Sequence, residues 1–460
     1  MINQMIVKMN RFPLLVLTAL CVHLCASAYA EPIDSVAIGE YGSEWVGDYC
    51  WEFYITEHGA VIESANWEEW KPAVTPTPVG DLVVPRQLNG RPVVGIGNYA
   101  FIQDWESGDE MNITSIDIPD TVTSYGDQVF GYGCNFEEFE FKEGVTSVGN
   151  YVLMECYNLK RLKIAGTIKE TGYSPFSTGG GYGGVLEELE LGEGLTEIGD
   201  YWFQYSMSLK ELAIPSTVTN IGSYAFTGLG GYVYDGEDYS HPISVVLPQG
   251  LKRLGDYAFG YSGGLREIVV PDSVDQIGQG VFEECSNLTN IVLGAGISQV
   301  PRSLCKECRM LKAVDCRASI GRIDADAFYA CKSLETFPFS TILTYIGEGA
   351  FYGCTVLTGV DLSEGLTFIG GSAFDDCDAI ESIRLPSTLR QGGLGDVAFG
   401  SCDRLADVYI PGTVGAVGAS CFRNCSALTN VCISSGITSI GSSAFYGCAA
   451  LGEIIFWVAD

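Results

Sequence analysis

The residues best suited to chemistry are cysteines that recur at one position of a repeating pattern. Most lie 23 residues from the next: Cys156, Cys285, Cys308, Cys331, Cys354, Cys377, Cys402, Cys425 and Cys448. Adjacent strands would hold them about 5 Å apart, within the Cα range of a disulfide. Side chains that point the same way do not bring their sulfur atoms together. The spacing therefore favours a structural ladder of small buried thiols, which runs from Cys285 to Cys448.

One pair, Cys305 and Cys308, has the CxxC form of a redox centre or half of a zinc site. Zinc needs further ligands, for which Cys316 is the one nearby candidate. Histidine is scarce, since only His58 and His241 lie beyond residue 30. Because Cys308 belongs to the cysteine column and Cys305 replaces a recurrent Phe, we expect structural cysteines, no metal and no cofactor.

No spacing in the chain predicts catalysis. Two histidines leave little material for a Ser-His or Cys-His couple, and no glycine-rich run has phosphate-loop spacing. Carboxylates are abundant, but no pair of them is singled out by the pattern. We therefore expect a protein that is not an enzyme, with a glycan-active enzyme that uses loop carboxylates as a remote alternative.

Three insertions interrupt the pattern at the same place and offer candidate ligand-binding residues. They are "IQDWESGDEMN" with Trp105, "STGGGYGGV" with Tyr182, and "TGLGGYVYDGEDYSH" with Tyr232, Tyr234, Asp235, Tyr239 and His241. Loops at one repeat position crowd one rim, which is often the binding rim. Aromatic rings beside carboxylates suit a sugar, a basic protein patch or calcium; a tolerated glycine-rich insertion remains the alternative.

Outward strand positions supply the other candidate surfaces. Val246, Val269 and Val292 align as an apolar strip, and Tyr409, Cys432 and Ile455 align as another. Exposed apolar patches often mark contact surfaces, although a β-branched residue is also ordinary in a strand. A charge ladder precedes the strips: Glu137, Glu138, Glu140, then Lys160, Arg161, Lys163, then Glu187, Glu188, Glu190.

These residues sit on a repeated line, [V/I/L]-T-x-I-G-x-x-A-F-x-G-C-x-x-L-x-x-I-x-L-[P/G]. Fifteen copies start between Val93 and Ile437, most of them 23 residues apart. A period of this size predicts a solenoid, in which each coil completes its core against its neighbours. "LxxIxL" predicts one short strand per coil and "AFxGC" a brief helical or 3₁₀ turn, so that the Phe residues stack as a buried spine. The Gly after Ile requires either φ > 0 or a close backbone approach.

The line "IGxxAFxGCxxLxxIxLP" resembles the BspA-like branch of the leucine-rich repeats over residues 81–460. The resemblance implies an α/β solenoid: a right-handed superhelix with a parallel β-sheet on its concave face and short helical or 3₁₀ turns on its convex side. It further implies a secreted or surface-displayed interaction module or adhesin without catalytic residues.

The two ends of the chain differ from the array. Residues 1–30 have the basic start, apolar run and Ala-Tyr-Ala end of a secretory signal peptide. Residues 31–92 are expected to form a β-rich cap with a partial zeroth repeat, and residues 93–460 the array.

Fifteen cysteines follow the leader, an odd number, so at least one thiol is unpaired within a monomer. The chain stops soon after an apolar strand with Phe456 and Trp457, which predicts a minimal lid, a truncation or a contact between two molecules.

Charge and pattern together define the expected function. The chain has 57 acidic and 25 basic residues, a net charge of −32, and the leader removes two of the basic ones. Such acidity disfavours nucleic acids and anionic membranes as binding partners, because like charges repel. No segment after the leader has the roughly 18 consecutive apolar residues of a membrane span. We expect an exported, non-catalytic adhesion or interaction scaffold that binds a protein or glycan through its concave face and rim loops. A self-associating structural surface component is the main alternative.

Overall fold

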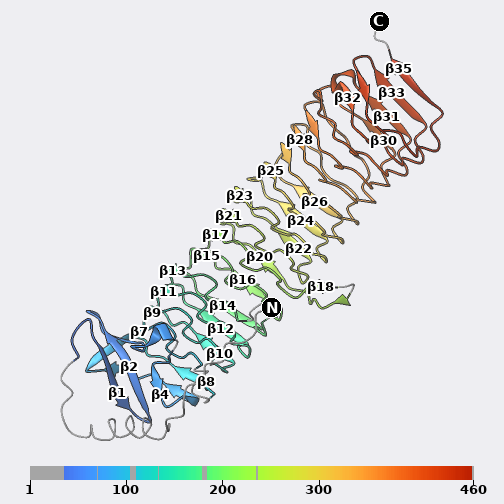
Figure 1. The fold of residues 1–460 in the computed structure, drawn as a ribbon. Coiled ribbons are helices and arrows are strands. Elements are labelled where there is room, and N and C mark those ends of the chain that lie inside the picture. Colours follow the sequence, from blue (N-terminus) through green and yellow to red (C-terminus); the bar gives the residue numbers. More distant parts are fainter. Residues whose placement is uncertain are drawn as a thin grey trace, which may run out of the picture.

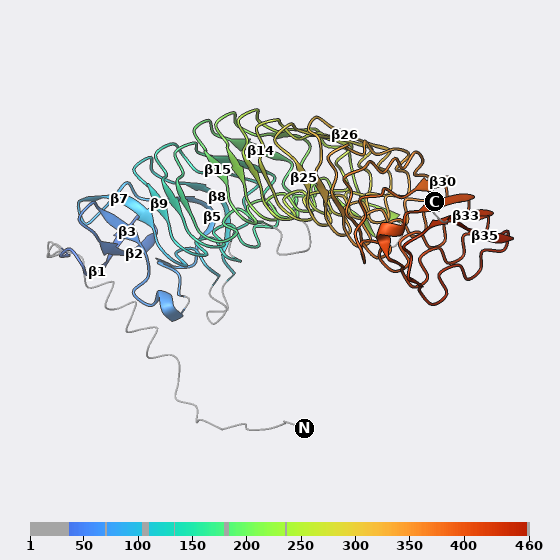
Figure 2. The same ribbon diagram turned by 90° about the horizontal axis from the view of Figure 1, so that it is seen from above.

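The fold is a curved stack of similar coils. The computed structural model describes residues 36–69, 71–103, 110–132, 134–178, 184–234 and 237–457. Figure 1 shows the coils stacked from the N-terminal sheet to the last strand, and Figure 2 shows the curvature of the stack. The fifteen sequence repeats wind into a β-solenoid of about 14 turns, which confirms the predicted fold class.

The "LxxIxL" segments form one face of the solenoid, here called the long-strand sheet. Inward Leu and Ile alternate with outward polar residues, and adjacent coils pair in parallel, as Leu162 does with Leu189. Its strands are β5 (Val79–Val83), β8 (Asn112–Asp117), β10 (Glu138–Glu140), β12 (Arg161–Ile164), β14 (Glu188–Leu191), β16 (Leu212–Ala213), β20 (Val245–Val246), β22 (Glu267–Val269), β24 (Asn290–Leu293), β26 (Ala313–Cys316), β30 (Ser382–Arg384), β31 (Asp407–Ile410), β33 (Asn430–Ser434) and β35 (Glu453–Trp457).

The "TxIG" segments form a second face, the short-strand sheet, whose strands are two residues long. They also pair in parallel along the stack, as Ile323 does with Ile346 and Ile346 with Ile369. Its strands are β9 (Ser124–Tyr125), β11 (Ser147–Val148), β13 (Glu170–Thr171), β15 (Glu197–Ile198), β17 (Asn220–Ile221), β21 (Arg253–Leu254), β23 (Gln276–Ile277), β25 (Gln299–Val300), β27 (Arg322–Ile323), β28 (Tyr345–Ile346), β29 (Phe368–Ile369), β32 (Ala416–Val417) and β34 (Ser439–Ile440).

The long-strand sheet is interrupted between β26 and β30. The intervening coils keep their inward Phe337 and Leu362 buried. However, Pro338 has no N–H to donate to a ladder, and Gly359 adopts a left-handed φ of 64°. Two coils therefore preserve the core without regular strand pairing.

The predicted phenylalanine spine is confirmed. Stacked neighbours have ring centroids 5.2–6.0 Å apart and interplanar angles of 3–20°. Leu153 and Cys305 replace Phe in two coils, and the rings are buried except in the last coil, where Phe445 is half-buried. The spine comprises Phe101, Phe130, Phe176, Phe203, Phe226, Phe259, Phe282, Phe328, Phe351, Phe374, Phe399, Phe422 and Phe445.

The "AFxGC" segment, expected as a brief helical or 3₁₀ turn, consists of hydrogen-bonded turns that do not join into a helix. Residues two before and two after the Phe adopt left-handed φ, as Ser372 (50°) and Asp376 (63°) do around Phe374. A residue of this kind every four positions prevents a helix from propagating. The Phe374 N–H instead donates to Ala398 O of the next coil, at 2.8 Å. Among the described residues the helices are two 3₁₀ turns elsewhere, η1 (Trp67–Glu69) and η2 (Gly412–Val414).

The repeated glycine is explained by close approach of the coils. At Gly370, an added Cβ would lie 2.4 Å from Glu348 N of the preceding coil, and at Gly149 it would lie 2.5 Å from Gly126 O. Neither glycine has a left-handed φ. The close approach, rather than φ > 0, is therefore the reason for glycine here.

The first coils are covered by an antiparallel sheet. It is built from β1 (Tyr41–Val46), β2 (Tyr49–Ile55), β3 (Ala60–Ile62) and β4 (Val74–Thr75), and β6 (Gln87–Leu88) pairs with β7 (Arg91–Ile96). Strand β3 pairs in parallel with β7, which crosses from the cap segment into the first repeat. Trp51 is buried with its ring 6.4 Å from Phe101, so the cap core continues into the spine.

Candidate functional site

The cysteine column lies inside the turns. The nine column cysteines and all other described cysteines are free thiols. Each ladder Sγ from Cys285 to Cys448 donates to a carbonyl of the preceding coil over 3.0–3.2 Å, in all but one case that of the spine Phe. Burial raises the pKa of Cys354 and Cys377 well above the usual thiol range. Their geometry suits a structural contact.

The CxxC pair is part of this arrangement. Cys305 and Cys308 are fully buried, and Cys305 occupies the spine position while its carbonyl accepts the Cys331 thiol. Burial raises the pKa of Cys316 to about 12. Within the described ranges, no group of three or more His, Cys, Asp or Glu side chains is placed to hold a metal ion.

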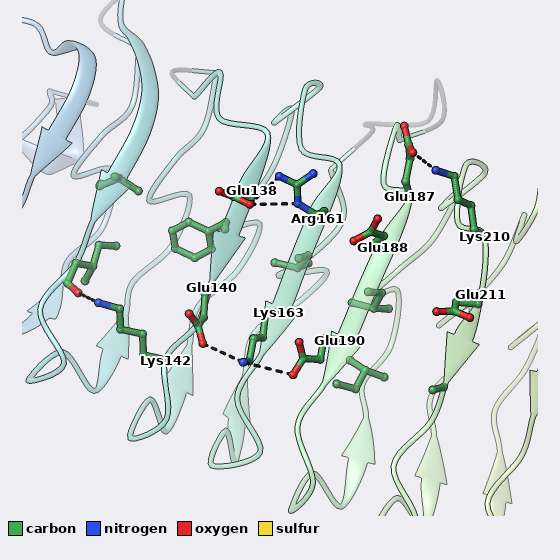
Figure 3. A pocket seen from close by; sticks show the side chains of 17 residues that line it. Glu138, Glu140, Lys142, Arg161, Lys163, Glu187, Glu188, Glu190, Lys210 and Glu211 are labelled. Atoms are coloured by element: carbon green, nitrogen blue, oxygen red, sulfur yellow. Dashed lines mark hydrogen bonds and ion pairs between the residues drawn. The ribbon is translucent and has the colours of Figure 1, made fainter.

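A hollow of about 1050 Å³ lies on the outward face of the long-strand sheet (Figure 3). Its floor crosses β10, β12, β14 and β16, where inward Phe139, Leu162 and Leu189 fix the register of the strands. The charged side chains that line it are Glu138, Glu140, Lys142, Arg161, Lys163, Glu187, Glu188, Glu190, Lys210 and Glu211.

Opposite charges meet across adjacent strands of the hollow. Arg161 Nη2 lies 2.7 Å from Glu138 Oε2, and the Glu138 carboxylate raises the pKa of the Arg161 guanidinium. Lys163 lies 3.4 Å from both Glu140 and Glu190 (Figure 3). The lining contains six carboxylates and four cations. The hollow therefore keeps a negative charge after these pairs form.

The predicted valine strip continues from the hollow along the same sheet. Val246 pairs in register with Ala213 at the edge of the hollow, and Val269 pairs with Val292. Val246 is 71% exposed and Val269 45% exposed, whereas Val292 is half-buried. The strip therefore presents mainly two side chains.

The longest insertion is a hairpin of β18 (Val233–Tyr234) and β19 (Glu237–Asp238) that projects beside the solenoid (Figure 1). Asp238 Oδ1 accepts the Ser240 N–H at 2.9 Å, and Asn287 Nδ2 donates to Ser240 Oγ at 2.9 Å. The first bond is local, and the second anchors the outgoing strand to a later coil. The described part of the insertion is thus an ordered hairpin rather than an irregular loop.

The hairpin candidates have different environments. Tyr232 and Tyr239 are exposed, with ring centroids 6.0 Å apart. His241 lies at the base, where its Nε2 is 2.6 Å from Met207 O. This contact uses the imidazole to hold the hairpin to the preceding coil. Tyr234 belongs to β18, but its side chain is outside the described part.

Several predictions fall outside the described residues. They are Trp105, Tyr182, Asp235 and the leader 1–30. The structure therefore does not test whether the three insertions meet at one rim. No helix in the described ranges is long and apolar enough to cross a membrane.

The BspA type leucine-rich repeat region matches in six copies, over residues 94–231, 238–335 and 321–452. The chain belongs to this family. A comparison with curated proteins gave no match.

Solved structures include other leucine-rich repeat proteins. One from Bacteroides ovatus is 20% identical with a TM-score of 0.55, over 92% of this chain and 99% of its own. This likeness concerns the fold. A leucine-rich cell surface protein from Faecalibacterium prausnitzii is 22% identical with a TM-score of 0.45, over 91% of this chain and 96% of its own.

The sequence reading missed one feature of this BspA-type array, the set of side chains two residues before the spine Phe. Tyr201, Tyr224 and Tyr257 occupy that position in consecutive coils and contact one another. Their alignment was visible in the repeat register. The signal was easy to overlook because later coils place Gly, Ser, Asp or Val there.

Proposed function

We propose that the protein is an exported, non-catalytic interaction scaffold that binds a partner protein through the long-strand sheet. The observation that carries this proposal is the acidic hollow, which adjoins the valine strip at Ala213. A partner with a basic segment and an apolar contact would complement both surfaces. Family membership supports the role, because leucine-rich repeat surface proteins generally mediate protein interactions.

Electrostatics specifies the kind of partner. The net charge of −32 attracts basic surfaces over long range, and the hollow concentrates carboxylates at Glu188 and Glu211. Complementary charge mainly accelerates association, and salt weakens this effect. Apolar contact with Val246 and Val269 would contribute affinity that salt does not screen.

An array of purified matrix and cell-surface proteins, probed with residues 31–460, tests the proposal. We expect capture of basic proteins, with an association rate that falls as salt increases. The Glu188→Lys/Glu211→Lys variant should bind a captured protein about tenfold or more weakly, a loss of about 1.4 kcal/mol. Asp407→Lys, at the matching strand position in β31, is the control.

Two outcomes would count against the proposal. One is unchanged affinity in the Glu188→Lys/Glu211→Lys variant. The other is capture of no protein together with concentration-dependent chains in sedimentation, which would favour the self-associating alternative.

A further inference from the structure

A row of tyrosines runs along the solenoid axis, at the corner between the short-strand sheet and the turns. Successive ring centroids are 5.4, 4.7, 4.9 and 5.0 Å apart. The row crosses five consecutive coils and is separate from the hollow on the long-strand sheet. Its members are Tyr151, Tyr173, Tyr201, Tyr224 and Tyr257.

The fold does not require tyrosine in this row. Tyr201, Tyr224 and Tyr257 adopt left-handed φ of 61°, 57° and 54°. Bulky residues are unfavourable in this conformation. Later coils have the same backbone with a small residue, as at Ser303 (55°) and Ser420 (54°). The tyrosine rings are therefore not required for the backbone conformation of the coil.

The stacking determines which ring atoms are available. Tyr201 and Tyr224 are inclined by 7°, and Tyr224 and Tyr257 by 15°. The facing sides of these three rings cover one another, so this part of the row presents ring edges and hydroxyl groups. Earlier in the row the rings are inclined, by 61° between Tyr151 and Tyr173 and by 39° between Tyr173 and Tyr201. Burial raises the pKa of Tyr224 and Tyr257, so these hydroxyls remain donors as well as acceptors.

In two coils of the row, an aspartate directly precedes the tyrosine. Asp200 Oδ1 accepts the Ser223 N–H at 2.6 Å, and Asp256 Oδ1 accepts the Gln279 N–H at 3.0 Å. These bonds hold the carboxylates beside the tyrosines. The corner therefore repeats a phenol edge and a polar group from coil to coil.

We propose that this row binds a linear, uncharged polysaccharide that lies along the solenoid axis with one sugar residue to each coil. The ring spacing is close to the length that one hexose spans in an extended β-linked chain. Hydroxyls and carboxylates match the hydrogen-bonding groups of sugars, and C–H edges of the rings contact their apolar patches. The chain's charge of −32 repels polyanionic glycans, which selects uncharged ones.

Native affinity electrophoresis tests this proposal, with soluble mixed-linkage β-glucan, xylan, mannan or alginate in the gel. We expect at least one neutral glycan to retard residues 31–460, and alginate not to. Tyr201→Ser/Tyr224→Ser should weaken retardation about tenfold or more, because contact tyrosines commonly carry much of the binding energy. Serine suits the left-handed backbone, so unchanged circular dichroism and thermal unfolding would show that the coil is intact.

Tyr329→Ser/Tyr352→Ser is the matched control. It removes another stacked pair, with centroids 4.6 Å apart, in coils that lack the row. Its affinity should equal that of the wild type. Affinity for oligosaccharides of the retarding glycan should also rise with chain length up to about the five sugars that the row would contact.

Three results would overturn the inference: no retardation by any neutral glycan, equal affinity in the Tyr201→Ser/Tyr224→Ser variant, or tighter binding of alginate. None of these would affect the proposed protein partner. The Glu188→Lys/Glu211→Lys variant should retain glycan binding, so the two proposals fail independently.

Discussion

Each ladder cysteine bonds the coil before it through its side chain. Cys354 Sγ donates to Phe328 O at 3.2 Å, and Cys377 Sγ donates to Phe351 O at 3.1 Å. The same carbonyls accept the N–H of the cysteine in their own coil. A small thiol can approach the backbone this closely, which a larger apolar side chain could not do.

Thiol reactivity should follow position in the ladder. Burial raises the pKa of Cys448 to about 11, but this thiol lies in the last coil and is half-buried, whereas Cys354 and Cys377 are enclosed. We expect iodoacetamide to label Cys448 well before Cys354 in the native protein, because reaction needs an accessible thiolate. Peptide mass spectrometry over time measures both rates.

Unfolding in guanidinium is the control, in which all fifteen thiols of residues 31–460 should react. Native labelling of Cys354 as fast as Cys448 would contradict a buried ladder. So would a disulfide between any two column cysteines.

Among the elements, the turn between the short strands and the spine is the most constrained. Its two left-handed residues direct backbone N–H groups to the next coil, and its glycine admits the neighbouring backbone. Substitution of this glycine therefore acts on two coils.

We expect Gly370→Ala to destabilise the protein by about 1–3 kcal/mol, the usual effect of overpacking. The added Cβ would lie 2.4 Å from Glu348 N, a backbone atom that cannot rotate away. Gly452→Ala is the control, because a Cβ there meets nothing within 4 Å. Urea unfolding measures both variants, and equal stability would refute the close-approach explanation.

The columns explain which elements the sequence could predict. Leu212 and Ile214 recur at every second position in "LKELAI", so the strand and its inward face could be predicted, as could the spine at Phe226. The left-handed turn could not, because Ser, Asp, Val and Tyr all occupy its φ > 0 positions and form no recognisable motif. The hollow also needed coordinates, since its depth depends on how neighbouring strands are arranged.

Across the whole molecule, the folded coils hold a large excess of negative charge. The 57 acidic residues outnumber the 25 basic ones, and stacking brings many of them closer than an unfolded chain would. Self-repulsion of this kind destabilises a compact state and is screened by salt. The charge ladder at β10, β12 and β14 is a local exception, because Lys163 lies between Glu140 and Glu190.

We therefore expect the melting temperature of the wild type to rise from low to high sodium chloride, as screening weakens repulsion more than it weakens the exposed ion pairs. Lys163→Gln should melt lower at low salt and gain more from salt, because Glu140 and Glu190 would lose the cation between them. Lys252→Gln removes an exposed positive charge away from the ladder and is the control. Thermal unfolding followed by circular dichroism measures all three proteins. A wild-type melting temperature that falls with salt would contradict this. It would mean that the ion pairs of the charge ladder affect stability more than the repulsion from the net charge.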